Sequence, residues 1–195
     1  MQLLLATTNA GKIRELKELL GADYQILSLK DFPDIPPAVE NGTSFAENAL
    51  IKARLAAAHS HIWTLADDSG LAVDYLNGAP GIYSARFAGE NATDAENNAK
   101  LLSLLVDIPY EKRTAQFICA IALVSPNGEE YTFMGASCGH LLVAPLGTDG
   151  FGYDPLFYSD ELGETFAQAS SAQKNTVSHR SRALAKACAF LQTQK

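Results

Sequence analysis

The 195-residue chain lacks the features that mark membrane and secreted proteins. No apolar run approaches the roughly 20 residues that a membrane-spanning helix needs, so no membrane partner is expected. The N-terminus has neither the charged segment nor the long apolar core of a signal peptide. Cysteine is scarce, and Cys119, Cys138 and Cys188 are spaced too widely for a metal site. These absences predict a cytoplasmic protein with reduced, buried cysteines.

Positive charge is also scarce. The chain has 15 Lys and Arg against 22 Asp and Glu, a net charge of −7. No basic run is present to neutralise many phosphates, which argues against nucleic acid as a partner. A single nucleotide needs only a few local cations, so small phosphorylated ligands are compatible with this balance. The 47% hydrophobic content and the length predict one globular domain over residues 1–195.

Hydrophobic periodicity alternates between helix-like and strand-like segments. Residues 44–47 and 93–96 each carry the Ser/Thr-x-x-Glu capping box that opens a helix, and Pro-Asn-Gly at 126–128 indicates a hairpin. This interleaving predicts an α/β fold with a mixed sheet and flanking helices. The expected strands are 2–6, 24–29, 62–66, 71–76, 114–125 and 129–143, and the expected helices are 11–20, 44–59, one that opens after 93, and 179–192.

The first candidate site is the segment 7–12 (Thr-Thr-Asn-Ala-Gly-Lys), which leads from an apolar strand into a helix. Free backbone N–H groups and the helix dipole favour an anion there, and Lys12 adds a full positive charge, so the segment predicts phosphate binding. The segment is not a Walker A loop, because Ala6 and Ile13 stand where that motif needs Gly and Ser or Thr. The alternative is an ordinary turn capped by Asn or Thr.

The second candidate site is the pair Asp67 and Asp68, which follows the expected strand 62–66. Adjacent strand residues point to opposite faces of a sheet, so the two carboxylates are expected to have different roles. One would hold magnesium, which prefers carboxylate oxygen, and the other would bond to neighbouring backbone. The alternative is a polar Asp-Ser-Gly turn.

Two further segments combine polar groups with unusual loop chemistry. Segment 147–155 has three glycines within six residues and aromatic side chains between them, which allows close approach to a ligand and offers a flat face to a base. Segment 174–180 carries Lys174, His179 and Arg180 into the last helix. The alternatives are a loop that packs its aromatics on the core and a solvated cationic surface.

In this order, the segments resemble the inosine triphosphate pyrophosphatases along nearly the whole chain. The resemblance implies an elongated, two-lobed fold with a central cleft, a homodimer, and magnesium-dependent release of pyrophosphate from ITP, dITP or XTP. The implied role is to cleanse the nucleotide pool so that deaminated purines do not enter DNA or RNA. The matching stretches are 6–12, 44–49 with Lys52, 66–71, 78–86, 150–155 and 178–180.

The resemblance also implies roles for particular residues. Asp68 resembles the general base and a magnesium ligand, Glu40 the other metal-binding carboxylate, and Ser69 a substrate contact. Lys52, one helical turn beyond Asn48, would face the phosphates, unless it is a solvated helix lysine. The triphosphate-binding residues would be Thr7, Thr8, Asn9, Ala10, Gly11 and Lys12. The base and sugar pocket would be Phe151, Gly152, Tyr153, Asp154, Lys174, His179 and Arg180.

Two alternatives to this function remain open on the sequence. A Maf-like pyrophosphatase of related architecture would prefer other bases, and a nucleotide sensor would bind without turnover. For oxo-purines, donors from His179 or Arg180 would pair with the 6-oxygen and reject the amino group of adenine.

Overall fold

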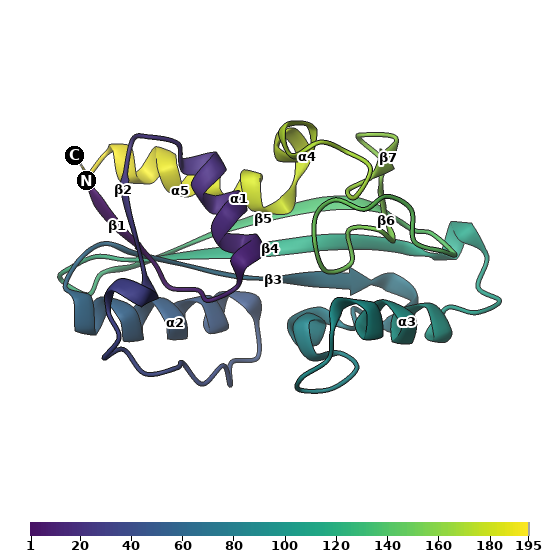
Figure 1. Ribbon diagram of the computed structural model, residues 1–195, viewed down its shortest axis with the longest axis horizontal. Helices are drawn as coiled ribbons and strands as arrows, with labels where there is room; N and C mark the ends of the chain where they lie inside the picture. Colours follow the sequence, from purple (N-terminus) through teal and green to yellow (C-terminus); the bar gives the residue numbers. More distant parts are fainter. Residues whose placement is uncertain (195) are drawn as a thin grey trace. The chain divides into compact units, whose positions relative to one another are not determined.

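The computed structural model describes residues 1–194 and contains a mixed sheet with helices packed on it (Figure 1). The strand order is β2-β1-β3-β4-β5-β6-β7. β1 pairs in parallel with β2 and β3, whereas β6 pairs antiparallel with β5 and β7. The predicted α/β fold with a mixed sheet is confirmed. The strands are β1 (Gln2–Leu5), β2 (Gln25–Ser28), β3 (Thr64–Val73), β4 (Thr114–Val124), β5 (Glu130–Leu141), β6 (Phe157–Ser159) and β7 (Glu164–Thr165), and the helices are α1 (Ala10–Leu20), α2 (Phe45–Ser60), α3 (Asp94–Leu104), α4 (Ser171–Val177) and α5 (His179–Gln192).

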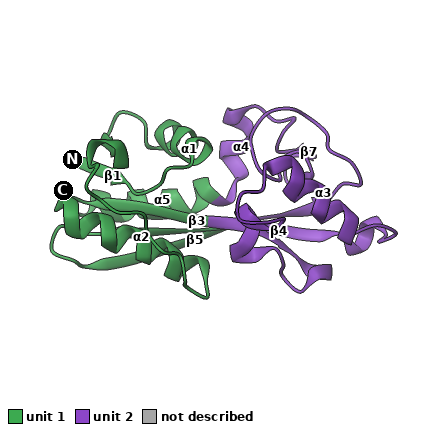
Figure 2. Cartoon of the chain, turned by 60° about the horizontal axis from the view of Figure 1, so that its bottom comes forward, with its two compact units in different colours: residues 1–68, 119–135, 180–195 green, residues 69–118, 136–179 purple. Residues whose placement is uncertain are grey.

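The chain divides into two compact units (Figure 2). Unit 1 comprises residues 1–68, 119–135 and 180–195, and unit 2 comprises residues 69–118 and 136–179. Strands β3, β4 and β5 each contribute residues to both units. The predictions of one domain over residues 1–195 and of a central cleft stay predictions.

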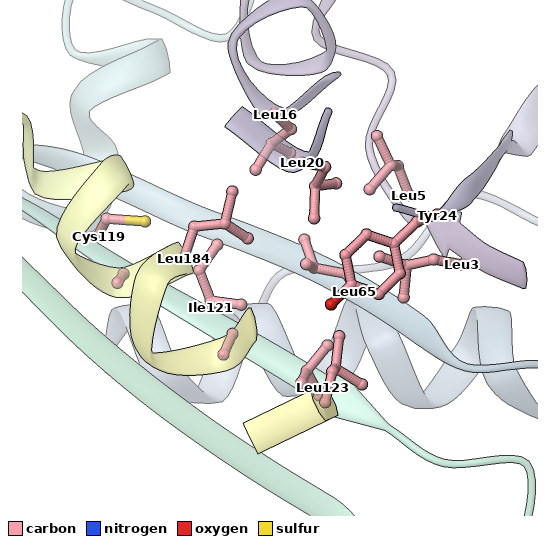
Figure 3. Packing of buried hydrophobic residues seen from close by; sticks show 13 residues of the cluster. Leu3, Leu5, Leu16, Leu20, Tyr24, Leu65, Cys119, Ile121, Leu123 and Leu184 are labelled. Carbon is pink, nitrogen blue, oxygen red and sulfur yellow. The ribbon is translucent and has the colours of Figure 1, made fainter. Parts of the chain in front are cut away.

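In unit 1, helices cover both faces of the sheet: α1 and α5 lie on one face and α2 on the other (Figure 1). The pleat of β1 sorts its side chains accordingly. Leu3 and Leu5 belong to the cluster with α1 and α5, and Leu4 to the cluster with α2. Figure 3 shows Leu16 of α1 and Leu184 of α5 in the first of these clusters. A sheet covered on both faces explains why these strands read as almost continuous apolar runs.

Helix α2 packs on the sheet through small side chains. Ala49, Ala53, Ala56 and Ala57 form the apolar stripe expected of a helix with one buried face, and all are buried. The helix begins after Ser44, whose Oγ accepts from the Glu47 backbone N–H at 3.2 Å.

The capping box predicted at 44–47 is only half formed. The Glu47 carboxylate accepts from Thr43 N at 2.6 Å and from the Thr43 hydroxyl at 2.8 Å, one residue before the predicted partner. The second predicted box is complete, with Thr93 and Glu96 capping α3 reciprocally.

The two strands predicted at 62–66 and 71–76 are one strand, β3, so the prediction of a break between them is wrong. The polar residues 67–70 continue the strand because ion pairs compensate the burial of both aspartates. Gly70 also serves the strand, not a turn: a Cβ at this position would lie 2.9 Å from Ser84 Cβ. Close approach of the segment containing Ser84 therefore requires glycine here.

Most other predicted elements are confirmed, including α5 and the hairpin between β4 and β5. At the turn of this hairpin, Ser125 N donates to Glu129 O at 2.9 Å. Strands β6 and β7 and helix α4 were not predicted. All three cysteines are free, but Cys138 is exposed and Cys188 half-buried, so the prediction that all are buried is wrong. Within residues 1–194, every helix is too short or too polar to cross a membrane.

Candidate active site

The strand-to-helix turn of unit 1 is a capped turn. Asn9 is the N-cap of α1, and its Oδ1 accepts from Lys12 N at 3.0 Å. Thr7 Oγ1 accepts from Asn9 N at 3.2 Å. Thr8, Asn9 and Ala10 are exposed, whereas Thr7, Gly11 and Lys12 are half-buried. The capped-turn alternative is therefore correct about the local structure, and the role of residues 7–12 in phosphate binding stays a prediction.

A buried network of charges lies on the α1 and α5 face of β3. The Lys12 ammonium pairs with the Asp67 carboxylate, and Asp67 Oδ2 accepts from Arg180 Nε at 3.0 Å and from Cys119 Sγ at 2.9 Å. Arg180 Nη1 also pairs with the Glu15 carboxylate. Burial works to raise the pKa of Asp67, but the charges of Arg180 and Lys12 outweigh it and hold that pKa well below its usual range. Asp67 is therefore a fixed negative charge.

The opposite face of β3 carries a second set of charges. Lys52 of α2 places its Nζ 3.0 Å from Asp68 Oδ1 and 2.9 Å from Glu40 Oε2. The Lys52 side chain is only 13% exposed, so the solvated-lysine alternative is wrong. Burial is the main reason that the pKa of Asp68 is raised, although Lys52 acts against it. Burial would lower the pKa of Lys52, but the charges of Asp68 and Glu40 raise it overall.

Glu40 and Asp68 together have the chemistry to hold a hard divalent cation. Their oxygens share one ammonium as a partner, and Asp68 Oδ2 is buried without a hydrogen-bond partner among residues 1–194. Such an orphaned carboxylate oxygen is the donor that a hard cation prefers. The same residues contain no group of three or more His, Cys, Asp or Glu side chains suited to a metal. A pair of carboxylates is nonetheless the usual protein contribution where phosphates and waters complete the coordination.

Unit 2 assembles its predicted residues around a buried ion pair. Lys174 of α4 donates to Asp154 Oδ2 at 2.6 Å, and both side chains are buried. The same oxygen accepts from Phe151 N at 2.9 Å, and Lys174 Nζ lies 5.3 Å from the centre of the Phe151 ring. The solvated-surface alternative is therefore wrong for Lys174. Its cation instead fixes the loop that carries Phe151.

The other predicted residues of unit 2 divide between buried and half-buried positions. Tyr153 is buried and donates from its hydroxyl to Ser84 O at 2.8 Å, so the core-packing alternative describes this ring. His179 is buried and stacks on Phe117 with ring centres 4.7 Å apart. Phe151 and Ser69 are half-buried.

Sequence reasoning missed some members of these networks. Glu15 lies three residues after Lys12 on α1. This helical spacing was the available signal that the two side chains would join the same charge network. Arg180 pairs with Asp67 and Glu15, whereas the sequence placed Arg180 with the base pocket.

The fold and these side chains define a class: an α/β protein that places lysines and buried carboxylates on a mixed sheet, with an aromatic loop held by an ion pair. The model of the Ham1 family matches residues 3–190, and the chain belongs to that family.

Relatives support this assignment over nearly the full length. The "dITP/XTP pyrophosphatase" of Geobacter sulfurreducens is 56% identical, over 94% of this chain and 93% of that protein. The protein of the same name from Desulforamulus reducens is 52% identical, over 98% and 96% of the two chains. The solved structure of the Staphylococcus aureus Ham1 protein is 41% identical, with a TM-score of 0.89 and complete coverage of both chains.

Proposed function

We propose that this chain hydrolyses the non-standard purine nucleoside triphosphates ITP, dITP and XTP to the monophosphate and pyrophosphate. The activity removes deaminated purines from the nucleotide pool before they enter DNA or RNA. Relatives 56% and 52% identical are named dITP/XTP pyrophosphatases. The observation that carries the proposal is Asp68, a buried carboxylate with one oxygen on Lys52 and the other without a hydrogen-bond partner among residues 1–194. A carboxylate with a raised pKa is suited to a general base.

Magnesium is the proposed cofactor, with Glu40 and Asp68 as its protein ligands. Bound there, magnesium would neutralise part of the charge on the phosphate oxygens. Asp68 orients the attacking water and takes its proton. Lys12 pairs with Asp67, but its charge also acts to lower the pKa of Asp68 on the other face of the strand. Lys12 and the backbone of residues 7–11 hold the phosphates, and this positioning lowers the barrier to in-line attack.

Unit 2 supplies the recognition of the base and sugar in this proposal. The Phe151 ring offers a flat face for the purine, with Lys174 and Asp154 fixing its loop. His179 and Arg180 are the two candidate donors to the 6-oxygen, and Arg180 also holds Asp67 and Glu15 through Nε and Nη1. The further members of this pocket are Ser69, Gly152 and Tyr153, the last through its backbone because its ring packs in the core.

Two properties of the proposal concern the assembly and the compartment. The protein acts as a homodimer, as its family resemblance implies, and light scattering of the purified protein measures this directly. It acts in the cytoplasm, where its three free thiols would stay reduced.

The deciding experiment incubates purified protein and magnesium with ITP, XTP, dITP, ATP and GTP and measures pyrophosphate and orthophosphate separately. Pyrophosphate from the oxo-purine substrates, with slow turnover of ATP, is the expected result. Direct release of orthophosphate, or equal rates on ATP and ITP, would refute the proposal. Turnover confined to modified pyrimidines would indicate the Maf-like alternative, and binding without turnover a sensor.

The role of Asp68 has its own test. Asp68→Asn keeps the size of the side chain and removes its basicity, so turnover should be lost while much nucleotide binding persists. Asp23→Asn, an identical change at an exposed position in the same unit, should leave the rate unchanged. A rate near wild type in Asp68→Asn would exclude Asp68 as the base.

A further inference from the structure

One residue of the aromatic loop in unit 2 is held by helix α3 at both of its backbone polar groups. Gly152 N donates to Asp94 Oδ2 at 2.7 Å, and Gly152 O accepts from Asn98 Nδ2 at 2.9 Å. Asp94 and Asn98 are four residues apart and therefore lie on one face of α3. A single peptide segment is thus held from one helix face by an acceptor and a donor.

The neighbours of Gly152 are anchored by hydrogen bonds of their own. Phe151 N bonds to Asp154 Oδ2, and the Tyr153 hydroxyl bonds to Ser84 O. Gly152 itself has a φ of 62°, in the left-handed region that favours glycine. Asp94 holds the peptide on the C-terminal side of Phe151, Asn98 holds the next peptide, and the Asp154 carboxylate holds the peptide on the N-terminal side of Phe151. These contacts therefore hold the backbone on both sides of Phe151, whose ring is half-buried.

The hydrogen bond from Asn98 to Gly152 O requires an unfavourable burial of the Asn98 amide. Asn98 is 8% exposed, and its Oδ1 is buried without a hydrogen-bond partner among residues 1–194. A buried amide that leaves its acceptor unused is unfavourable unless its donor is needed. Here the donor is the Asn98 amide, and the group that needs it is the Gly152 carbonyl. Apolar residues of α3 such as Leu101 pack on the core of unit 2, and that packing does not need an amide at position 98.

We propose that Asp94 and Asn98 are positioning residues that orient the Phe151 ring for the purine base. This inference rests on the proposed function, because it takes the aromatic loop as the base-binding element. Base–aromatic stacking acts through area and angle, so a ring that tilts away loses it. Binding of the triphosphate, which other residues carry, would be unaffected.

The test compares Asp94→Ala and Asn98→Ala with Asn97→Ala. Asn97 is the matched control because it is a buried asparagine on the same helix whose bonds go to Ala88 N and Ala85 O and not to Gly152. For the two positioning variants, KM for ITP should rise about fivefold or more while kcat stays within about twofold. Asn97→Ala should show no such split between KM and kcat.

Two readouts separate positioning from general loss of structure. Inhibition of ITP turnover by inorganic tripolyphosphate should be unchanged in Asp94→Ala, because this probe has no base. Hydrogen exchange in a peptide spanning residues 147–156 should become faster in Asp94→Ala and not in Asn97→Ala.

Asp94→Asn keeps an acceptor oxygen and should restore KM to within about twofold of wild type. Asp94 is exposed, so its variants remain informative even if Asn98→Ala does not fold.

The outcomes distinguish this inference from the proposed function. Unchanged KM in Asp94→Ala and Asn98→Ala, or equal losses for ITP and tripolyphosphate, would overturn the inference alone. A wild-type protein that does not turn over ITP would refute the proposed function and the inference together.

Discussion

Replacing Asp67 by Asn tests how much the buried charge network stabilises unit 1. Asp67 is fully buried between the Lys12 ammonium and the Arg180 guanidinium, and Glu15 is a second acid on Arg180. The network thus holds two cations and two anions. The variant leaves two cations with one carboxylate, and it points an amide N–H₂ at groups that also donate.

The size of the loss follows from burial. Removing one partner of a buried ion pair costs about 3–5 kcal/mol, because the remaining charge stays desolvated. For a chain of this length, that loss should lower Tm by roughly 6–20 °C. Urea unfolding at neutral pH, in chelator and without nucleotide, measures the free energy directly. The m-value should stay constant, because the same surface is exposed on unfolding.

The matched control is an exposed ion pair of the same unit. Arg54 Nε lies 2.6 Å from Glu130 Oε1, with side chains 51% and 35% exposed. Solvent screens such a pair, so Glu130→Gln should cost less than about 1 kcal/mol. A loss of stability in Asp67→Asn no larger than that in Glu130→Gln would refute the stabilising role of the buried charges.

Three further predictions address the metal site, the core and a helix cap. Lys52→Met should tighten Mn²⁺ binding, measured by electron paramagnetic resonance without nucleotide, because the ammonium contacts the Glu40 and Asp68 oxygens; weaker binding would contradict competition. Leu184→Ala should cost about 2–5 kcal/mol in urea unfolding, since the side chain is buried between α5 and the sheet; a loss below about 1 kcal/mol would contradict this packing. Ser44→Ala should cost about 1 kcal/mol by the same assay, through loss of the cap on Glu47 N, and no change would show that the cap is dispensable.

Local signals predicted helices α1, α2, α3 and α5 but not α4. The Thr93–Glu96 box and the hairpin at 126–128 depend on neighbouring residues, and both occur in the structure. The half-formed box at Ser44 shows the limit of such signals, because Glu47 had two nearby donors and the spacing did not decide between them.

Strand β3 was misjudged for a physical reason. Four polar or glycine residues in a row favour a turn when only local preferences are considered. The burial of Asp67 becomes favourable through Arg180, which lies 113 positions away from it along the chain. A partner at that separation leaves no periodic signal, so the sequence alone suggested two strands instead of one.

The two adjacent aspartates show what the sequence could and could not predict about the candidate site. Alternation along a strand predicted that Asp67 and Asp68 would face opposite ways, and their separate partners confirm it. Alternation could not predict which of the two carboxylates has the lower pKa. The surroundings of the two carboxylates differ in the structure. The cations around Asp67 outweigh its burial and lower its pKa, whereas burial raises the pKa of Asp68. Environments that shift the pKa values of two neighbouring acids in opposite directions favour one acid as a structural charge and the other as a proton acceptor. The proposed base is therefore Asp68, and Asp67 serves to hold Lys12 and Arg180 in place.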